Sequence, residues 1–298
     1  MSTVSRTRVG LGELTRIRAE HPQAIAEALR RRQSRPLLGG NGRLMIIAAD
    51  HPARGALGAG ERQLAMANRL DLLERLCLAL ARPGVDGVLG TADILEDLAL
   101  LGALDGKVVL GSMNRGGLAG ASFELDDRFT GYRAADIERA RFDGGKLLLR
   151  LDLADPGSLR TMEAAAHAVA ELASRGLLAM VEPFMAARVD GKVRNDLSAA
   201  AISKSIAIAS GLAGTSAHTW LKIPVAEDMA ELATVVASTT LPTVLLGGEV
   251  SADPDGTFER WRAALRLPSV RGLVVGRSLL YPADDDVAAA VDTAVGLL

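Results

Sequence analysis

The sequence has little cysteine and few aromatic residues. Cys77 is the only cysteine among 298 residues, which excludes an internal disulfide. A single thiol inside the apolar run LERLCLALA is typical of a core helix, and a chain without disulfides suits the reducing cytoplasm. Only 3% of residues are aromatic whereas 49% are hydrophobic. The core must therefore be built mainly from aliphatic side chains.

Long apolar runs and an excess of one charge are also missing. No stretch is long enough and free enough of charge to cross a bilayer, and the first ten residues contain no apolar signal core. The 34 basic and 36 acidic residues leave a net charge of −2. Phosphate backbones are bound by clustered basic surfaces, and the short basic run 30–32 is better explained as a solvated helix end. We therefore predict neither a membrane nor a nucleic-acid partner.

Histidine is scarce as well. The four histidines, at positions 21, 51, 167 and 218, are scattered along the chain. A catalytic zinc site needs several such ligands at neighbouring positions in the fold, and the sequence offers no such set. We predict that the protein uses no metal and no other cofactor.

What the chain does contain is an alternation of short apolar runs with Ala/Leu-rich helical patterns. Apolar runs without period-two alternation are typical of strands covered on both faces. We interpret eight of them as strands, at 43–50, 86–90, 107–112, 145–152, 176–183, 219–225, 242–249 and 271–278. Helical spacing is clear at 64–81, 158–175 and 198–210. Eight strand–helix units predict an α/β protein of the (β/α)8, or TIM, barrel type.

A doubly wound open sheet is the alternative architecture. Such a sheet usually carries G-x-G-x-x-G after its first strand, but here the first strand ends in ADHPARG. We predict that residues 43–298 form the barrel as a catalytic domain. Residues 1–42 are predicted to form a helical extension, packed across the N-terminal end of the barrel or at a subunit contact.

Three charged residues interrupt apolar strands. Lys146, Glu182 and Lys222 lie on the fourth, fifth and sixth runs, and barrel active sites lie at the C-terminal ends of strands. Buried charges are costly unless paired, so we expect the three to meet there. A lysine among apolar neighbours and a second cation has a depressed pKa, which makes its amine a nucleophile toward carbonyls, and a nearby carboxylate can relay protons. A purely structural Lys–Glu ion pair is the alternative.

The last two strands end in glycine. Gly247-Gly248 and Gly276-Arg277 predict a phosphate site, because glycine lets backbone N–H groups approach an anion closely. Arg277 would add a charge-assisted contact, and Ser251 in the preceding loop a hydrogen bond. Tight turns, with Arg277 in a surface salt bridge, are the alternative.

Other candidate substrate contacts lie at the ends of earlier strands. Asp50 is expected to bind or deprotonate a substrate hydroxyl, and His51 follows it. A structural role stays open for both, with Asp50 capping the loop and His51 packed behind it. Arg150 on the fourth strand and Asn114 in the loop 112–118 are further candidates, although that loop could equally be a tight turn.

Together these residues resemble the class I, Schiff-base aldolase superfamily of deoxyribose-phosphate, tagatose-1,6-bisphosphate and archaeal-type fructose-bisphosphate aldolases. Its strand-four lysine motif is similar to GKLLLRLD, its strand-five glutamate motif to AMVEP, and its Schiff-base lysine motif to WLKIPV. Its phosphate-binding strand ends are similar to LLGGEVS and GLVVGRS. The first-strand Asp-His of the archaeal-type enzymes is similar to IIAADHP. The resemblance covers 43–281. It implies a metal-independent aldehyde-lyase in which Lys222 forms an imine with a phosphorylated keto sugar.

The stretch LLGGNGRLMIIAADHPARG is similar to an actinobacterial aldolase group met alongside inositol-catabolism enzymes. That similarity implies cleavage of 2-deoxy-5-keto-6-phosphogluconate to dihydroxyacetone phosphate and malonic semialdehyde. The tyrosine that some class I aldolases use as proton donor has no counterpart at a strand end, because Tyr132 and Tyr281 lie elsewhere. Glu182 with Lys146 is the candidate donor instead.

Other functions stay open at this point. One is a class I aldolase acting on fructose or tagatose bisphosphate, deoxyribose phosphate or a sulfo-sugar phosphate. Another is an isomerase or epimerase with Glu182 as base, and a third is a non-catalytic sugar-phosphate-binding barrel. In each case the expected partners are a small sugar phosphate and further copies of the chain in a homo-oligomer.

Overall fold

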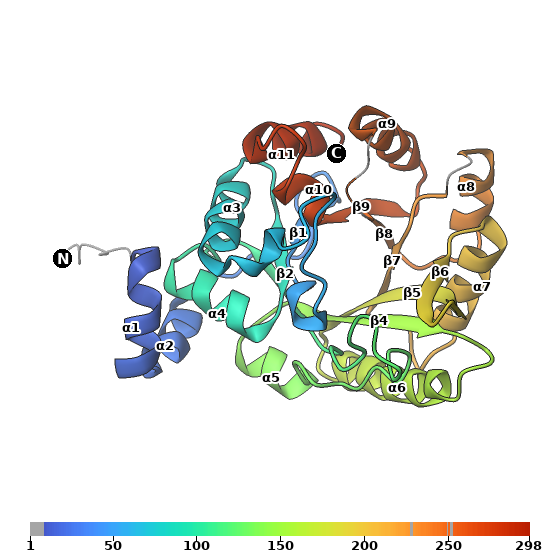
Figure 1. Ribbon diagram of the computed structural model, residues 1–298, viewed down its shortest axis with the longest axis horizontal. Helices are drawn as coiled ribbons and strands as arrows, with labels where there is room; N and C mark the ends of the chain where they lie inside the picture. The colour runs from blue at the N-terminus through green and yellow to red at the C-terminus, as the bar shows by residue number, and fades with distance from the viewer. Residues whose placement is uncertain (1–8, 227–228, 249, 251–252) are drawn as a thin grey trace.

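In a computed structural model of the chain, eight parallel strands close into a barrel (Figure 1). The structure describes residues 9–226, 229–248, 250 and 253–298. The parallel strands are β1 (Leu44–Ala48), β2 (Gly87–Gly90), β3 (Val108–Ser112), β4 (Gly144–Leu151), β5 (Leu178–Val189), β7 (Thr219–Ile223), β8 (Thr243–Leu246) and β9 (Val270–Val275). Pairing of β4 with β5 and of β9 with β1 joins the sheet to itself. The predicted TIM barrel is confirmed.

Helices alternate with the strands and form the outer layer. They are α3 (Arg69–Ala81), α4 (Ala92–Leu100), α5 (Ala134–Arg139), α6 (Gly157–Ser174), α7 (Ala199–Ser210), α8 (Met229–Val236), α9 (Pro254–Ala264), α10 (Arg277–Leu280) and α11 (Val287–Val295), preceded by α1 (Leu14–Glu20) and α2 (Gln23–Arg31). Short 3-10 turns occupy η1 (Leu11–Glu13), η2 (Pro52–Arg54) and η3 (Ala65–Ala67). In the described part of the chain, no helix combines the length and apolarity needed to cross a membrane.

The first of the predicted helices begins later than its apolar pattern suggests. The side chain of Asn68 accepts hydrogen bonds from the backbone N–H groups of Leu70 and Asp71, so α3 starts at Arg69. An asparagine in this position satisfies backbone donors that the helix itself leaves unpaired. The apolar residues before Asn68 therefore form a separate turn. The stretches predicted at 158–175 and 198–210 correspond to α6 and α7.

Two apolar cores hold the barrel together. The larger one fills the space between the strands and the helices. The smaller one lies inside the barrel and extends from the N-terminal ends of the strands up to the cavity, where Ala48 and Val274 line it. It consists of Leu44, Ile46, Ala48, Leu89, Val108, Leu110, Leu178, Met180, Trp220, Val244 and Val274. Nearly all of these inner residues are aliphatic, as the low aromatic content requires. These residues, which we call the apolar plug, fill the lower part of the interior, so that polar groups are left the part toward the C-terminal ends of the strands.

The N-terminal extension packs beside the barrel. Figure 1 shows α1 and α2 next to α4, and Arg18 of α1 donates a 2.8 Å hydrogen bond to Asp97 of α4. The segment after α2 then crosses the N-terminal ends of the strands. Arg32 donates a 2.8 Å hydrogen bond to the carbonyl of Lys107, and Leu37 packs against the inner core. The expected covering of the barrel end is thus made by this segment, while the two helices lie on the side.

One strand was not predicted. β5 extends beyond the barrel and turns back into β6 (Lys192–Asp196), which pairs with it in antiparallel fashion. The turn consists of Asp190 and Gly191, both with positive φ (50° and 74°). An Asp-Gly pair with apolar residues on either side is a strong hairpin signal, because a two-residue turn needs positive φ at both positions. The sequence Val-Asp-Gly-Lys-Val contains that signal, whereas the polar strand β6 has no apolar run.

Candidate active site

The alternation of side chains along the strands gathers charged groups in one layer inside the barrel. Residues two apart on a strand face the same side of the sheet. Glu182 therefore faces inward as Met180 does, and Lys222 faces inward as Trp220 does. Asp50 follows β1 and Lys146 lies on β4, and both line the same cavity. The charged layer thus lies directly above the apolar plug.

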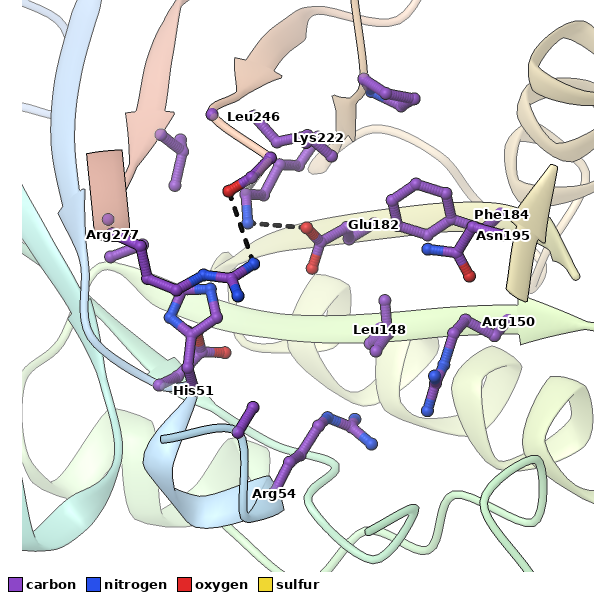
Figure 2. Close-up of a pocket in the computed structure, with 18 of the residues that line it drawn as sticks. His51, Arg54, Leu148, Arg150, Glu182, Phe184, Asn195, Lys222, Leu246 and Arg277 are labelled. Carbon is purple, nitrogen blue, oxygen red and sulfur yellow. Dashed lines mark hydrogen bonds and ion pairs between the residues drawn. The ribbon is translucent and has the colours of Figure 1, made fainter. Parts of the chain in front are cut away.

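A chain of ion pairs connects these residues. Lys222 Nζ donates a 2.7 Å hydrogen bond to Glu182 Oε1, as Figure 2 shows. The other carboxylate oxygen of Glu182 contacts Lys146 Nζ. Lys146 Nζ also donates a 3.2 Å hydrogen bond to Asp50 Oδ2. Lys146 therefore bridges two carboxylates, and Glu182 lies between two amines.

Asp50 is held through one of its two oxygens. Besides Lys146, its Oδ2 accepts a 3.1 Å hydrogen bond from Ser112 Oγ and lies 2.6 Å from Arg115 Nη2. The nearest partner of Oδ1 is His51 Nδ1 at 4.0 Å, and no hydrogen bond from a described residue reaches this oxygen. Oδ1 is thus the oxygen available to a ligand in the cavity.

Burial and charge act against each other in this cluster. Lys146, Glu182 and Lys222 are 2%, 8% and 4% exposed. Burial lowers the pKa of Lys146 to about 8, although both carboxylates oppose the shift. Burial by itself would raise the pKa of Glu182, but the positive charges of Lys146 and Lys222 outweigh it and hold that pKa well below its ordinary value. The glutamate is therefore ionised at neutral pH, as its position between two amines requires.

Asp50 and His51 have fixed charge states near neutral pH. Burial alone would raise the pKa of Asp50, but the charges of Arg115 and Lys146 hold it well below its ordinary value. Burial lowers the pKa of His51 to about 3, so its imidazole is neutral. The cluster then contains three basic side chains, Lys146, Lys222 and Arg115, and two carboxylates. Such a balance suits an anionic ligand.

The cavity above the cluster measures about 980 Å³ and lies at the C-terminal ends of the strands. Figure 2 shows Lys222 and Glu182 near its centre, with His51 and Arg277 on one side and Arg150 and Asn195 on the other. A cavity of this size accommodates a small metabolite with a chain of several carbon atoms.

Three glycines line the cavity on the Arg277 side, and at two of them a side chain would collide with the protein itself. A Cβ on Gly247 would lie 2.5 Å from Val275 Cγ1, and one on Gly276 would lie 2.3 Å from the carbonyl oxygen of Ala48. Gly248 adopts a φ of 67°, which other residues rarely tolerate. All three glycines line the cavity, so their backbone is accessible to a ligand there.

Arg277 lies at the same strand ends as the glycines. Its Nη2 donates a 3.5 Å hydrogen bond to the carbonyl of Gly248, and its side chain lines the cavity. The guanidinium is therefore within reach of an anion bound at this side. Ser251, the remaining residue predicted to bind phosphate, lies outside the described residues.

The profile of the Cgl0159-like family matches residues 42–295 of the sequence. The chain belongs to this family. It is 57% identical to Cgl0159 from Corynebacterium glutamicum, whose crystal structure superimposes with a TM-score of 0.92 over 96% of this chain and 95% of that one. A search of curated proteins finds no match.

The Cgl0159-like barrel is also similar to solved aldolases. An archaeal fructose 1,6-bisphosphate aldolase superimposes with a TM-score of 0.65, 16% identity, and coverage of 92% of this chain and 98% of that one. A second archaeal structure, in which the catalytic lysine is covalently bound to the carbinolamine intermediate of the substrate, gives a TM-score of 0.64 with the same identity and coverage. At this identity the likeness establishes a shared fold.

Not every predicted residue lines the cavity. Asn114 is fully buried and hydrogen-bonds the backbone of Leu148 in both directions, since its Oδ1 accepts from Leu148 N at 2.8 Å. Its Nδ2 also donates to Asp127 at 3.1 Å. The structure therefore gives Asn114 a structural position that fixes the loop after β3 to β4. Tyr132 and Tyr281 likewise pack against the outer core and do not line the cavity.

Several basic residues that line the cavity were not predicted. Arg54 is buried and donates to Asp127 and to two backbone carbonyls, so it braces the loop after β3. Arg194 comes from the hairpin strand β6, and Arg260 comes from α9. None of these arginines lies at the end of a barrel strand, so the strand ends alone do not predict them. The Asp-Gly turn signal could have led to Arg194.

Proposed function

We propose that this Cgl0159-like protein is a class I aldolase, an aldehyde-lyase that cleaves a phosphorylated keto sugar or keto acid through a Schiff base on Lys222. The observation that carries the proposal is the buried amine of Lys222, hydrogen-bonded at 2.7 Å to a carboxylate that a second buried lysine also contacts. A buried amine in an accessible cavity is costly for the fold and is suited to nucleophilic attack on a carbonyl. Its position at the C-terminal ends of the barrel strands supports the same function.

The first half of the reaction joins Lys222 to the substrate. The neutral amine attacks the keto carbon and forms a carbinolamine, whose hydroxyl leaves as water after it takes up a proton, which gives an iminium ion. Glu182 relays the protons of these steps, because it already accepts a hydrogen bond from Lys222. Loss of the Lys222 charge removes one of the two positive charges that lower the pKa of Glu182, so the carboxylate then becomes a better proton acceptor.

The second half breaks the carbon–carbon bond. The hydroxyl on the carbon two positions from the iminium carbon gives its proton to Glu182 and becomes the carbonyl of the product aldehyde, while the electron pair of the broken bond moves into the iminium and forms an enamine. Glu182 returns the proton to the enamine carbon, and addition of water to the resulting iminium then releases the ketone product and Lys222. The accessible Oδ1 of Asp50 accepts a hydrogen bond from the substrate hydroxyl before cleavage. Because its pKa is well below the ordinary value, we assign Asp50 mainly an orienting role.

The phosphate of the substrate binds at the glycine strand ends. β7, which carries Lys222, pairs with β8, and β8 pairs with β9, so Gly247, Gly248 and Gly276 lie directly after the two strands that follow the nucleophile. Backbone N–H groups and the guanidinium of Arg277 would hold a phosphate next to the keto carbon. The substrate is then a ketose or keto acid with its phosphate on the carbon adjacent to the carbonyl.

For the individual substrate we propose 2-deoxy-5-keto-6-phosphogluconate, with dihydroxyacetone phosphate and malonic semialdehyde as products. This narrower proposal rests on the resemblance of the first-strand region to an aldolase group associated with inositol catabolism. Fructose or tagatose bisphosphate, deoxyribose phosphate and sulfo-sugar phosphates are the alternatives within the same chemistry. A panel of these compounds ranks them directly, with release of dihydroxyacetone phosphate as the readout for all but deoxyribose phosphate, whose cleavage is followed by release of glyceraldehyde 3-phosphate.

The state of Glu182 favours an aldolase over an isomerase or epimerase. A base that removes a carbon-bound proton works best with a pKa near the working pH. Two lysines hold the pKa of Glu182 well below its ordinary value, which makes it a poor base in the free protein. A non-catalytic phosphate-binding barrel does not need a buried amine, which is costly for the fold.

Borohydride trapping tests the proposal. The protein is incubated with dihydroxyacetone phosphate, reduced with sodium borohydride and digested for peptide mass analysis, and the chain has only five lysines, at 107, 146, 192, 204 and 222. We expect one adduct, on Lys222, and none without the ketone. An adduct on Lys146 would move the nucleophile to β4, and the absence of any adduct would refute the Schiff-base mechanism. Retention of activity in excess EDTA is expected, and its loss would also contradict the proposal.

A further inference from the structure

Two polar atoms of the cavity wall lie near each other and have no hydrogen-bond partner among the described residues. Nδ1 of His51 is buried and unbonded, although the side chain as a whole is 23% exposed. Oδ1 of Asp50 lies 4.0 Å from it, and no described group donates a hydrogen bond to this oxygen either. Both residues line the cavity. Because an unpaired buried polar group is costly for a fold, the two atoms together mark a position for an atom of the ligand.

The distance between the two atoms fits one bridging oxygen. A separation of 4.0 Å is too long for a direct hydrogen bond. An oxygen between them can lie about 2.8 Å from both atoms, with an angle of about 90° between the two bonds. That oxygen must donate to the ionised Asp50 and accept from the imidazole of His51. A hydroxyl does both, whereas a phosphate or carboxylate oxygen has no proton for Asp50 and is repelled by it. The position therefore selects a hydroxyl group of the substrate.

The imidazole of His51 is held in place and is neutral. The carbonyl of His51 accepts a 3.0 Å hydrogen bond from the backbone N–H of Arg54, which anchors the residue at the start of η2. The ring lies against Gly276, where a Cβ would come within 3.1 Å of His51 Cε1. Burial lowers the pKa of His51 to about 3, and the charge of Arg277 adds to this effect while Asp50 opposes it. The ring therefore has a single N–H, and the negative charge of Asp50 favours that proton on Nδ1.

We infer that His51 is a further catalytic residue, which donates a hydrogen bond from Nδ1 to the substrate oxygen that becomes the aldehyde. This inference rests on the proposed aldolase function. Asp50 binds the oxygen only while it carries its hydroxyl proton. Once that proton has moved to Glu182, the oxygen retains the N–H of His51, which stabilises the negative charge that develops as the carbon–carbon bond breaks. In the reverse direction the same N–H polarises the aldehyde carbonyl toward attack by the enamine. His51 keeps its own proton throughout.

Hydrogen exchange and condensation separate the two halves of the reaction. Dihydroxyacetone phosphate alone forms the enamine on Lys222, and the exchange of its carbon-bound hydrogen in heavy water is followed by NMR. This exchange involves no aldehyde oxygen. Condensation with malonic semialdehyde or glyceraldehyde 3-phosphate, whichever the wild type uses faster, does involve one. Both rates are measured for the full-length protein and for His51→Leu, His51→Asn and His167→Leu. His167 is exposed on α6 and does not line the cavity, so it is the matched control for loss of an imidazole.

We expect the condensation rate to depend on His51 and the exchange rate to be independent of it. His51→Leu should lower kcat for condensation about 10²- to 10³-fold, the effect of removing one donor to a developing oxyanion, and change the exchange rate less than about 2-fold. Exchange at the wild-type rate also shows that the variant is folded around Lys222. His51→Asn should recover about 10-fold of the loss, because its amide supplies an N–H near the position of Nδ1. His167→Leu should behave as the wild type.

Four other results would overturn the inference and retain the aldolase. If exchange falls as much as condensation, the bridged oxygen belongs to the ketone half or His51 only supports the charged layer. Equal losses in His51→Asn and His51→Leu would show that no N–H is needed. A higher KM with an unchanged kcat would limit His51 to binding. A wild type that exchanges hydrogen but condenses with neither aldehyde has no aldehyde site beside His51. Absence of both exchange and a borohydride adduct in the wild type would instead refute the aldolase, and the inference with it.

Discussion

The interior of the barrel consists of two layers that the same strands build in different ways. Near the N-terminal ends, Met180 and Trp220 face inward on β5 and β7 and belong to an apolar plug. Two residues further along the same strands, Glu182 and Lys222 face inward and form a 2.7 Å hydrogen bond. All four residues are more than nine-tenths buried. Burial is thus similar in the two layers, and the chemistry differs.

The comparison shows how the fold supports a costly site. Apolar side chains stabilise a barrel by their burial alone, whereas buried ions lower stability unless each has a partner. In the charged layer every ion has one, since Glu182 lies between two lysines and Asp50 is held by Arg115 and Lys146. The apolar plug below excludes water from that side and holds the strands in register. One layer therefore provides stability and the other provides chemistry.

Lys222→Ala should have the largest effect on activity. Removing the nucleophile should lower kcat by a factor on the order of 10⁴ to 10⁶ and abolish the borohydride adduct. Lys204→Ala, which removes an exposed lysine on α7, should leave both unchanged. If the Lys222→Ala protein still forms a reduced adduct, the chemistry does not depend on the Lys222–Glu182 contact.

Glu182→Gln separates the two layers most directly. The amide keeps the shape but removes the charge between Lys146 and Lys222, so we expect kcat to fall about 10²- to 10⁴-fold and stability to fall by about 3–5 kcal/mol. Met180→Leu, in the apolar layer of the same strand, should cost less than about 1.5 kcal/mol and leave kcat unchanged. Urea unfolding and initial rates measure both. Similar losses in the two variants would contradict the division into layers.

The pH dependence of stability should carry the signature of Lys146. Burial lowers its pKa from 10.5 to about 8, so between these values the unfolded chain binds more protons than the folded protein. Stability should therefore rise with pH across this window, by up to about 3 kcal/mol, relative to a Lys146→Met variant that lacks the group. The measurement is urea unfolding of both proteins from pH 7 to 10.5. A constant difference between them would show that Lys146 is not perturbed.

A substitution within the apolar plug should have the smallest effect. Ile46 of β1 is fully buried in the plug, and Ile46→Val removes one methylene group. We expect a loss of about 0.5–1.5 kcal/mol in the free energy of unfolding and no change in kcat for the folded protein. Calorimetry and steady-state rates test this. A large drop in kcat without a matching loss of stability would mean that the plug also positions the charged layer.

Much of the fold was predictable because its signals are local. The eight apolar runs give the eight parallel strands, and the charged residues within them mark the layer that faces the cavity. β6 was not predicted as a strand because it is polar and exposed, although the Asp190-Gly191 pair predicts a hairpin turn before it. Arg194 was missed with it. Asn114 was predicted to bind substrate because it follows a strand, but its amide instead pairs with the backbone of Leu148, a contact between the loop after β3 and β4 that no local pattern contains.

The sequence by itself determined the barrel, the approximate positions of its strands and the presence of charged residues in apolar strands, since these follow from periodicity and composition within single segments. Only the tertiary structure decided that Asp50 joins the charged residues of the strands. Lys222 contacts Glu182 across two neighbouring strands, but Lys146 also reaches Asp50, which lies 96 residues earlier in the chain. Closure of the sheet brings these distant positions to one cavity, and the hairpin adds residues from outside the barrel. Such distances depend on how all the strands pack together, which no single segment encodes.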